Sequence, residues 1–267
     1  MVVLPPGTLL QLLYFEERVK GMPPGRFIEI GPGSGEITGR LLKLGWSGTV
    51  YDLSEETIAK LRQRFASEIG SGQLAVVLGD FLQLPAPSPP GASVDLIISC
   101  MVMEHLDVGA ERKFLEVSAT CLKGNGRMIG LVPASPRHWG IEDQIAGHCR
   151  RYSKESLVSL FRAKGWKLGH VAGLTYPVSN LLLPLSNFLV RRQESEKLDL
   201  SLLERTKHSG RRQVRFKTHF PSILKWLLNE RTMLPLHWIQ KLFVKSNNAL
   251  VLYFEATYKE PGAFGAG

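Results

Sequence analysis

Cysteine is scarce in this chain of 267 residues. The three cysteines, Cys100, Cys121 and Cys149, form no Cys-x-x-Cys pair, and an odd number argues against a framework of disulfide bonds. We therefore expect a cytoplasmic protein in which all three thiols are reduced and buried. His148 stands beside Cys149, but no second ligand pair occurs at metal-binding spacing, so the sequence predicts no metal site.

Long uninterrupted apolar segments are also missing. The first residues show no basic segment before an apolar run and no small-residue cleavage site after it, so we expect no signal peptide. Residues 171–190 carry no charge over about the length that crosses a bilayer, but two prolines, two serines and two asparagines interrupt them. A lid helix over a hydrophobic pocket, or a segment lying peripherally on a membrane surface, fits this stretch better.

Acidic residues are scarce in the C-terminal part of the chain. Residues 1–150 contain 14 Lys and Arg against 16 Asp and Glu, whereas residues 151–267 contain 19 against 8. The two parts therefore carry net charges of −2 and +11. Residues 205–219 hold six basic residues, Arg211 and Arg212 among them, and no acid. This segment suits an anionic partner or forms the solvated face of a helical cap.

The stretch RFIEIGPGSGEIT, residues 26–38, organises the rest of the chain. It predicts a short strand, a glycine turn and a helix. Glycine at alternate positions lets a ligand approach the backbone without meeting a Cβ atom. The dinucleotide fingerprint G-x-G-x-x-G needs glycine at position 36, where this chain has Glu36. Glu29 and Glu36 would repel a pyrophosphate but suit an ammonium or sulfonium group.

The pattern E-x-G-x-G-x-G resembles the loop of class I methyltransferases that bind S-adenosylmethionine, which carries both of those cations and no phosphate. DLIISCMVMEHLD resembles the fourth motif of small-molecule methyltransferases, including the quinone O-methyltransferases, and LKGNGRMIGLVP and GHCRRYS extend the likeness over about residues 25–170. The resemblance implies an α/β fold: a Rossmann-like seven-stranded sheet with helices on both faces and a helical insert before the last strand. The expected parts are an N-terminal helical cap (1–24), a cofactor-binding core (25–176), a substrate-recognition insert or lid (177–247), and a final strand with tail (248–267).

Carboxylates at predicted strand ends complete the expected cofactor site. Asp52 ends a second strand, where it can accept bonds from ribose hydroxyls, while Ser54 suits the cap of the next helix. The resemblance assigns Asp80 to the adenine amino group with Phe81 beside the ring; the alternative for Asp80 is a turn aspartate. The predicted cofactor-binding residues are Glu29, Gly31, Gly33, Gly35, Asp52, Leu53, Asp80, Phe81, Ser99 and Met101.

Candidate catalytic and substrate-binding residues follow the fourth and fifth strands. His105 is placed to take a proton from a hydroxyl or ammonium nucleophile, or it begins a helix with Glu104 and shapes the pocket. Residues 136–152 are too irregular for a core element. They form either a substrate-contacting loop, in which Asp143 is a further candidate contact, or an ordinary surface loop. The catalytic candidates are His105, His148 and Tyr152. The substrate-binding candidates are His138, Trp139, Arg151, Tyr176, Arg211 and Arg212.

These patterns predict transfer of a methyl group to a small organic acceptor. We expect O-methylation of a hydrophobic or acidic, natural-product or lipid-like molecule, with C- or N-methylation as alternatives. An RNA methyltransferase would use the basic part on phosphates, but no RNA-binding module is recognisable and Met-Glu-His is not the Asn/Asp-Pro-Pro-aromatic motif of many such enzymes. A membrane-associated binding protein without activity is a third alternative. The sequence does not fix the oligomeric state.

Overall fold

The computed structural model describes residues 3–84, 93–194 and 220–258, and the chain divides into two compact units. The sheet unit comprises residues 23–132, 154–171 and 253–267, and the helical unit comprises residues 1–22, 133–153 and 172–252. The predicted N-terminal cap and insert thus fall largely in one unit. Residues 133–153, which the sequence assigns to the core, belong to the helical unit as well.

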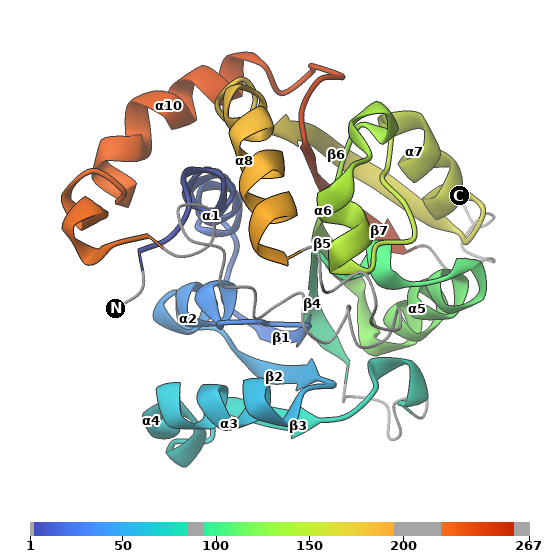
Figure 1. Cartoon of the computed structure of the whole chain (residues 1–267). Helices are drawn as coiled ribbons and strands as arrows, with labels where there is room; N and C mark the ends of the chain where they lie inside the picture. The colour runs from blue at the N-terminus through green and yellow to red at the C-terminus, as the bar shows by residue number, and fades with distance from the viewer. Residues whose placement is uncertain (1–2, 85–92, 195–219, 259–267) are drawn as a thin grey trace. The chain divides into compact units, whose positions relative to one another are not determined.

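Seven strands form one sheet in the order β3-β2-β1-β4-β5-β7-β6, which confirms the predicted seven-stranded fold (Figure 1). Their bounds are β1 (Arg26–Ile30), β2 (Ser47–Asp52), β3 (Leu74–Leu78), β4 (Val94–Cys100), β5 (Leu122–Pro133), β6 (Trp166–Leu174) and β7 (Val251–Tyr258). The pairs β1–β2, β2–β3, β1–β4 and β4–β5 are parallel. Their apolar runs fit a sheet whose two faces are both covered.

Helices connect these parallel strands. The helices of the sheet unit are α2 (Glu36–Lys43), α3 (Glu55–Arg64), α4 (Ala66–Gly70), α5 (Val108–Cys121) and α7 (Lys154–Arg162), with short 3₁₀ turns η1 (Phe81–Gln83) and η2 (Met103–His105). The chain moves outward from β1 to β3 in one direction and from β4 to β5 in the other. Because parallel crossovers are right-handed, α2 and α3 lie on one face and α5 on the other. Ser54 caps α3 as predicted, accepting a bond from Thr57 N at 3.3 Å.

The start of β5 differs from the sequence prediction. We expect a helix through Leu122 followed by a turn at residues 123–126, but the helix ends at Cys121 and β5 already begins at Leu122. The register is irregular there, because Val94 pairs with Leu122 while Leu96 pairs with Arg127. The four intervening residues are therefore an irregularity within the strand. Glycine-rich composition marks both a turn and a strand irregularity, so local composition does not separate the two.

The helical unit contains α1 (Pro6–Val19), η3 (Pro136–His138), α6 (Ile141–Ala146), α8 (Val178–Glu194), η5 (Ser222–Trp226) and α10 (Glu230–Leu242). Helix α1 packs against α10 and α8 (Figure 1). Val190 of α8 is buried with Ile145 of α6. Among the described residues no helix has the length and apolar character needed to cross a membrane. The proline-rich connector at 85–91 and the basic segment at 205–219 lie outside the described residues.

Candidate active site

The candidate site lies at the carboxyl ends of the parallel strands of the sheet unit. Strand order reverses between β1 and β4, and ligands of open α/β sheets bind at such a switch point. In the register, Ile30 at the end of β1 pairs with Tyr51 of β2 and with Ser99 of β4. The glycine loop after β1, Asp52 at the end of β2 and Met101 after β4 therefore share one edge of the sheet. Asp80 follows β3 by two residues at that same edge.

The glycine loop has the conformation that the sequence predicts. Gly31, Gly33 and Gly35 have φ values of +64°, +54° and +77°, which side chains disfavour. A Cβ atom added at Gly33 would meet nothing within 4 Å, whereas one at Gly35 would lie 2.7 Å from Phe65 Cε2. Gly33 therefore borders open space that a ligand can enter, and Gly35 is required by packing. The loop fits a cofactor that approaches the backbone closely.

Glu29 places a carboxyl group inside the sheet unit beneath this loop. Its side chain is buried, and Thr38 Oγ1 of α2 donates a hydrogen bond to Glu29 Oε2 at 2.6 Å. Burial raises the pKa of the Glu29 carboxyl to about 7, although the hydrogen bond from Thr38 opposes the shift. A buried carboxylate that is costly to ionise gains from a nearby cation. This environment suits the ammonium or sulfonium group expected from the sequence.

Glu36 does not provide the second carboxylate that we expect for such a cation. Arg64 Nη1 of α3 lies 2.6 Å from Glu36 Oε1 and also donates to the carbonyl oxygen of Ser34 at 2.5 Å. The guanidinium group balances the charge of Glu36 and ties the glycine loop to α3. The prediction is therefore corrected: Glu36 is paired with the Arg64 guanidinium, whereas Glu29 accepts its hydrogen bond from the neutral hydroxyl of Thr38.

The strand-end aspartates both make local bonds. Asp52 Oδ1 accepts a bond from Ser54 N at 2.8 Å, and Asp80 Oδ1 accepts one from Leu82 N at 2.9 Å. Asp80 thus has the turn role considered for it, and a carboxylate still has lone pairs for a ligand. Leu53, beside Asp52, exposes 47% of its surface, unusual for a large apolar side chain at a strand end. The local bonds hold both carboxylates in fixed orientations.

Phe81 lies in the core of the sheet unit rather than on its surface. Its ring centroid is 6.1 Å from that of Tyr51 and 5.6 Å from that of Phe114. The side chain is buried. Its expected position beside an adenine ring stays a prediction.

The residues that follow β4 show the signs of a ligand site. Ser99 is completely buried, and its Oγ makes no hydrogen bond within the described residues. Met101 adopts a positive φ of 57°, and its N–H donates to the carbonyl oxygen of Leu131 at 2.8 Å. Strained backbone and orphaned buried polar atoms concentrate at functional sites. Both observations fit a bound group at this end of the sheet.

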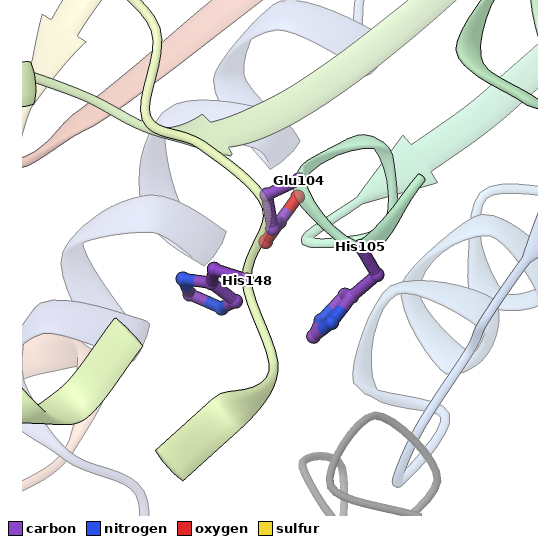
Figure 2. A group of neighbouring side chains, drawn as sticks. All are labelled: Glu104, His105 and His148. Carbon is purple, nitrogen blue, oxygen red and sulfur yellow. The ribbon is translucent and has the colours of Figure 1, made fainter. Parts of the chain in front are cut away.

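His105 lies on η2 immediately after this segment (Figure 2). Its neighbour Glu104 is completely buried, while His105 is partly exposed. Burial raises the pKa of the Cys100 thiol, and the charges of Glu29 and Glu104 raise it further. The third side chain in Figure 2, His148, follows α6 in the helical unit. Helix α5 begins at Val108, three residues after the end of η2, with Asp107 as its cap, so η2 is a separate turn.

Asp143 organises the predicted loop in the helical unit. Its buried carboxylate accepts bonds from Gly140 N at 2.9 Å, from His148 Nδ1 at 2.8 Å and from Arg151 Nε at 2.8 Å. Burial by itself would raise the pKa of Asp143, but the bonds from His148 and Arg151 outweigh it and lower the pKa. Because an ionised carboxylate only accepts, His148 Nδ1 carries the proton in this hydrogen bond.

Residues 136–152 are more ordered than the sequence suggests. They contain η3 and α6, and Tyr152 is buried with its N–H donating to the carbonyl oxygen of Pro133. The expectation that no part of this stretch is a core element is therefore wrong. Ile145 and Ala146 of α6 are buried together with Asp143, and the polar residues around them hide this in the sequence.

The other substrate candidates lie in the same unit but have different surroundings. His138 Nδ1 lies 2.9 Å from Ser135 Oγ, and burial, with the charges of Arg137 and Arg151, lowers the His138 pKa. Trp139 is exposed. The Tyr176 ring packs edge-on against that of Phe243 at 5.2 Å. Arg211 and Arg212 lie outside the described residues.

Two features of the structure are not predicted by the sequence. Thr38 is the hydrogen-bond partner of Glu29, nine residues away. This spacing belongs to no known motif, so the pair is apparent only once α2 is packed against β1. The burial of the cysteines is also only partly as expected. Cys121 is buried, whereas Cys100 is partly exposed and Cys149 is exposed.

A parallel sheet with a switch point, an open glycine loop and carboxylates at the strand ends define an α/β enzyme that binds an adenosine-containing cofactor. Comparison with known proteins narrows this class. A family model described as "Methyltransferase domain" matches residues 9–171, more than half of the chain. The chain therefore belongs to this methyltransferase family, and it is a class I S-adenosylmethionine-dependent methyltransferase.

Individual relatives cover the chain less completely. The probable ribosomal RNA small subunit methyltransferase A of Methanospirillum hungatei is 37% identical over 95 residues, which are 34% of this chain. The chain spans 37% of the length of that curated relative. This partial similarity does not show which acceptor the present chain methylates.

Two solved structures share the fold. The Burkholderia thailandensis 1,6-didemethyltoxoflavin-N1-methyltransferase, crystallised with 1,6-didemethyltoxoflavin and S-adenosylhomocysteine, aligns with a TM-score of 0.51 at 19% identity over 64% of this chain and 73% of that chain. The [4+2]-cyclase SpnF aligns with a TM-score of 0.55 at 14% identity over 94% of this chain and 81% of that chain. One fold thus carries different reactions, and the acceptor must be argued from the site.

Proposed function

We propose that this enzyme methylates a hydroxyl group of a small organic molecule that is hydrophobic or acidic. The observation that carries the proposal is the Asp143–His148 pair, in which a buried, ionised carboxylate fixes the histidine tautomer. An imidazole held in this way is suited to take a proton from a hydroxyl nucleophile. The resemblance of the fourth motif to quinone O-methyltransferases supports the same acceptor atom but stays a prediction.

Residues of the sheet unit would hold S-adenosylmethionine. The loop of Gly31, Gly33 and Gly35 would hold it, with open space at Gly33. Glu29 would balance its positive charge, and Asp52 would accept bonds from its hydroxyl groups. The remaining contacts are assigned to Leu53, Asp80, Phe81, Ser99 and Met101. The cofactor supplies a methyl group on an activated sulfonium, so the protein contributes mainly alignment, water exclusion and proton removal.

Replacing Asp52 by alanine is expected to weaken cofactor binding about a hundredfold, because two ribose bonds to a charged acceptor are lost. Titration of S-adenosylmethionine and S-adenosylhomocysteine by calorimetry measures this change. Glu55→Ala, an exposed acid on the next helix, is the matched control. Equal affinity in Asp52→Ala and the control would remove Asp52 from the site.

Replacing His148 by glutamine is expected to lower kcat for a hydroxyl acceptor by about 10²–10³-fold while leaving cofactor affinity unchanged, because a general base is lost. Asp143→Asn should shift the pH dependence of kcat as well, since an amide no longer enforces the Nδ1–H tautomer. His105→Gln is the comparison variant. If His105→Gln alone abolishes turnover, His105 is the base. If neither substitution lowers kcat, the acceptor is a carbon or a tertiary amine, which needs no strong base for attack. Tyr152 is the third candidate.

An RNA acceptor is the second candidate function. The similarity to a ribosomal RNA methyltransferase and the +11 charge of residues 151–267 favour it. Binding of RNA through phosphates would weaken steeply with salt. Transfer of labelled methyl groups to ribosomal RNA, with a strong salt dependence, would replace the small-molecule proposal.

We also propose that the enzyme works in the cytoplasm and contacts a membrane from that side. All three cysteines are free, which supports a reducing compartment. The uncharged stretch at residues 171–190 and the basic segment at residues 205–219 have the apolar and cationic composition that peripheral binding needs. Arg211 and Arg212 are assigned either to this surface or to an acidic substrate, together with His138, Trp139, Arg151 and Tyr176.

A further inference from the structure

Most of the exposed large apolar side chains of the described residues belong to one segment of the chain, in the helical unit. Of 17 such side chains, 12 lie between residues 181 and 243. Ten of these are on α8, η5 and α10, and Leu227 and Phe243 directly follow η5 and α10. Scattered apolar residues are ordinary on protein surfaces, but a concentration of this kind marks an interaction site. Both long helices lie beside α1 (Figure 1).

Helix α10 exposes an apolar face, whereas an ordinary surface helix packs its apolar face inward. Leu234, Trp238 and Leu242 are spaced four residues apart and so share one face, and all three are exposed, Trp238 to 66% and Leu242 to 80%. The face that packs inward carries Met233 and two polar side chains. His237 and Gln240 are both buried there.

The buried polar face of α10 is fully engaged with the rest of the helical unit. His237 Nε2 lies 2.8 Å from Glu17 Oε2 of α1. Gln240 donates to the carbonyl oxygen of Leu10 at 2.9 Å and accepts from Thr175 N at 2.9 Å. These bonds fix the rotation of α10. The exposure of its apolar face therefore follows from these hydrogen bonds and not from loose packing of the helix.

Helix α8 and the turn η5 extend the same character. Leu181, Leu185 and Phe188 recur at helical spacing and are exposed, while Val190 on another face is buried. In η5, Ile223 and Trp226 are more than 70% exposed. Two exposed tryptophans with leucine and isoleucine neighbours are typical of surfaces that enter the interfacial region of a bilayer.

Positive charge accompanies these apolar side chains. Residues 220–250 contain four basic residues and one acid. Lys225 adjoins Trp226, and Arg231 shares the outer face of α10 with Leu234 and Trp238; both cations are exposed. Arg192 stands four residues beyond Phe188 at the end of α8. Each patch of apolar side chains thus has a cation at its rim.

We propose that α8, η5 and α10 form a docking surface for an anionic lipid bilayer. The apolar side chains enter the headgroup boundary, and Lys225, Arg231 and Arg192 meet lipid phosphates. A second copy of the chain fits less well, because a two-fold contact would bring the same cations against one another. The proposal deepens the peripheral location given above, and its test does not depend on methyl transfer.

Co-sedimentation with vesicles tests the surface directly. The full-length protein is expected to bind vesicles of phosphatidylcholine mixed with phosphatidylglycerol. Trp238→Ser/Leu242→Ser should weaken that binding by about tenfold or more, since binding scales with the apolar area inserted. Lys225→Gln/Arg231→Gln should reduce the preference for phosphatidylglycerol over phosphatidylcholine alone. Val108→Ser/Val158→Ser, which alters exposed valines of the sheet unit, is the matched control and should bind as the parent does.

Two results would overturn the proposal. One is a vesicle experiment in which the parent protein does not bind anionic vesicles, or in which Trp238→Ser/Leu242→Ser binds them as well as the parent does. The other is light scattering that shows a dimer which this variant dissociates, because the face would then join two copies. Calorimetric titration of S-adenosylhomocysteine confirms that each variant is folded, and it reports on the proposed enzyme separately from lipid binding.

Discussion

Replacing Glu29 by glutamine is expected to raise the free energy of unfolding by about 3 kcal/mol at pH 8 and to change it little near pH 4.5. The folded-state pKa of about 7 lies above the ordinary value of 4.5, because burial disfavours the charged form. The stability contributed by the protonated group is thus complete below pH 4.5 and is lost as the pH rises through 7. Glutamine stays neutral, and its amide oxygen can still accept the bond from Thr38.

Urea unfolding of the parent and of Glu29→Gln between pH 5 and 8 measures this difference. Glu55→Gln, at an exposed position on α3, is the control and should give parallel curves. Thr38→Val removes the hydrogen bond that opposes the shift, so it should move the Glu29 titration to higher pH. A constant offset between the parent and Glu29→Gln at every pH would show that Glu29 is not titrating in this range.

The same substitution is expected to weaken S-adenosylmethionine binding about tenfold or more at pH 8. A cationic cofactor favours the ionised form of Glu29, so affinity of the parent should rise with pH through 7 and affinity of Glu29→Gln should not. Calorimetry across this pH range reports both effects. Stability gained and affinity lost at one residue would identify Glu29 as a group kept strained for ligand binding.

Alanine at Gly33 and alanine at Gly35 are expected to fail in different ways. Both positions have positive φ, which costs a side chain about 1 kcal/mol. At Gly33 the new methyl group meets nothing within 4 Å, so the protein should stay folded while the methyl occupies cofactor space. At Gly35 the methyl group would overlap Phe65 and Leu61, so the fold should lose about 3 kcal/mol.

Thermal unfolding and cofactor calorimetry of the two variants separate these outcomes. Gly33→Ala should melt within a few degrees of the parent and lose most of its cofactor affinity. Gly35→Ala should melt much lower. Gly72→Ala also has positive φ and no neighbour within 4 Å, but it lies in a surface turn away from the loop, so it controls for backbone strain alone. Normal cofactor binding by Gly33→Ala would place the ligand elsewhere.

Much of the sheet unit could be predicted from the sequence because its signals are local. The apolar runs at Leu74–Leu78 and Val94–Ser99 predict two strands, and the structure has β3 at Leu74–Leu78 and β4 at Val94–Cys100. Buried parallel strands have short apolar runs in the sequence, and the alternating glycines predict the turn that follows β1. The start of β5 was not predictable, since glycine and lysine there fit a turn as well as a strand irregularity.

The sequence by itself determined the order of strands and helices, the glycine turn and the placement of acids at strand ends, because each depends on neighbours a few residues away. Only the tertiary structure decided which acids are buried and what they meet. Glu36 receives Arg64 from the next helix, Asp143 receives both His148 and Arg151, and α10 turns its apolar face outward. The reason is that the partner and the buried face of a side chain depend on packing between distant segments, and periodicity shows that a helix has two faces without showing which one is covered.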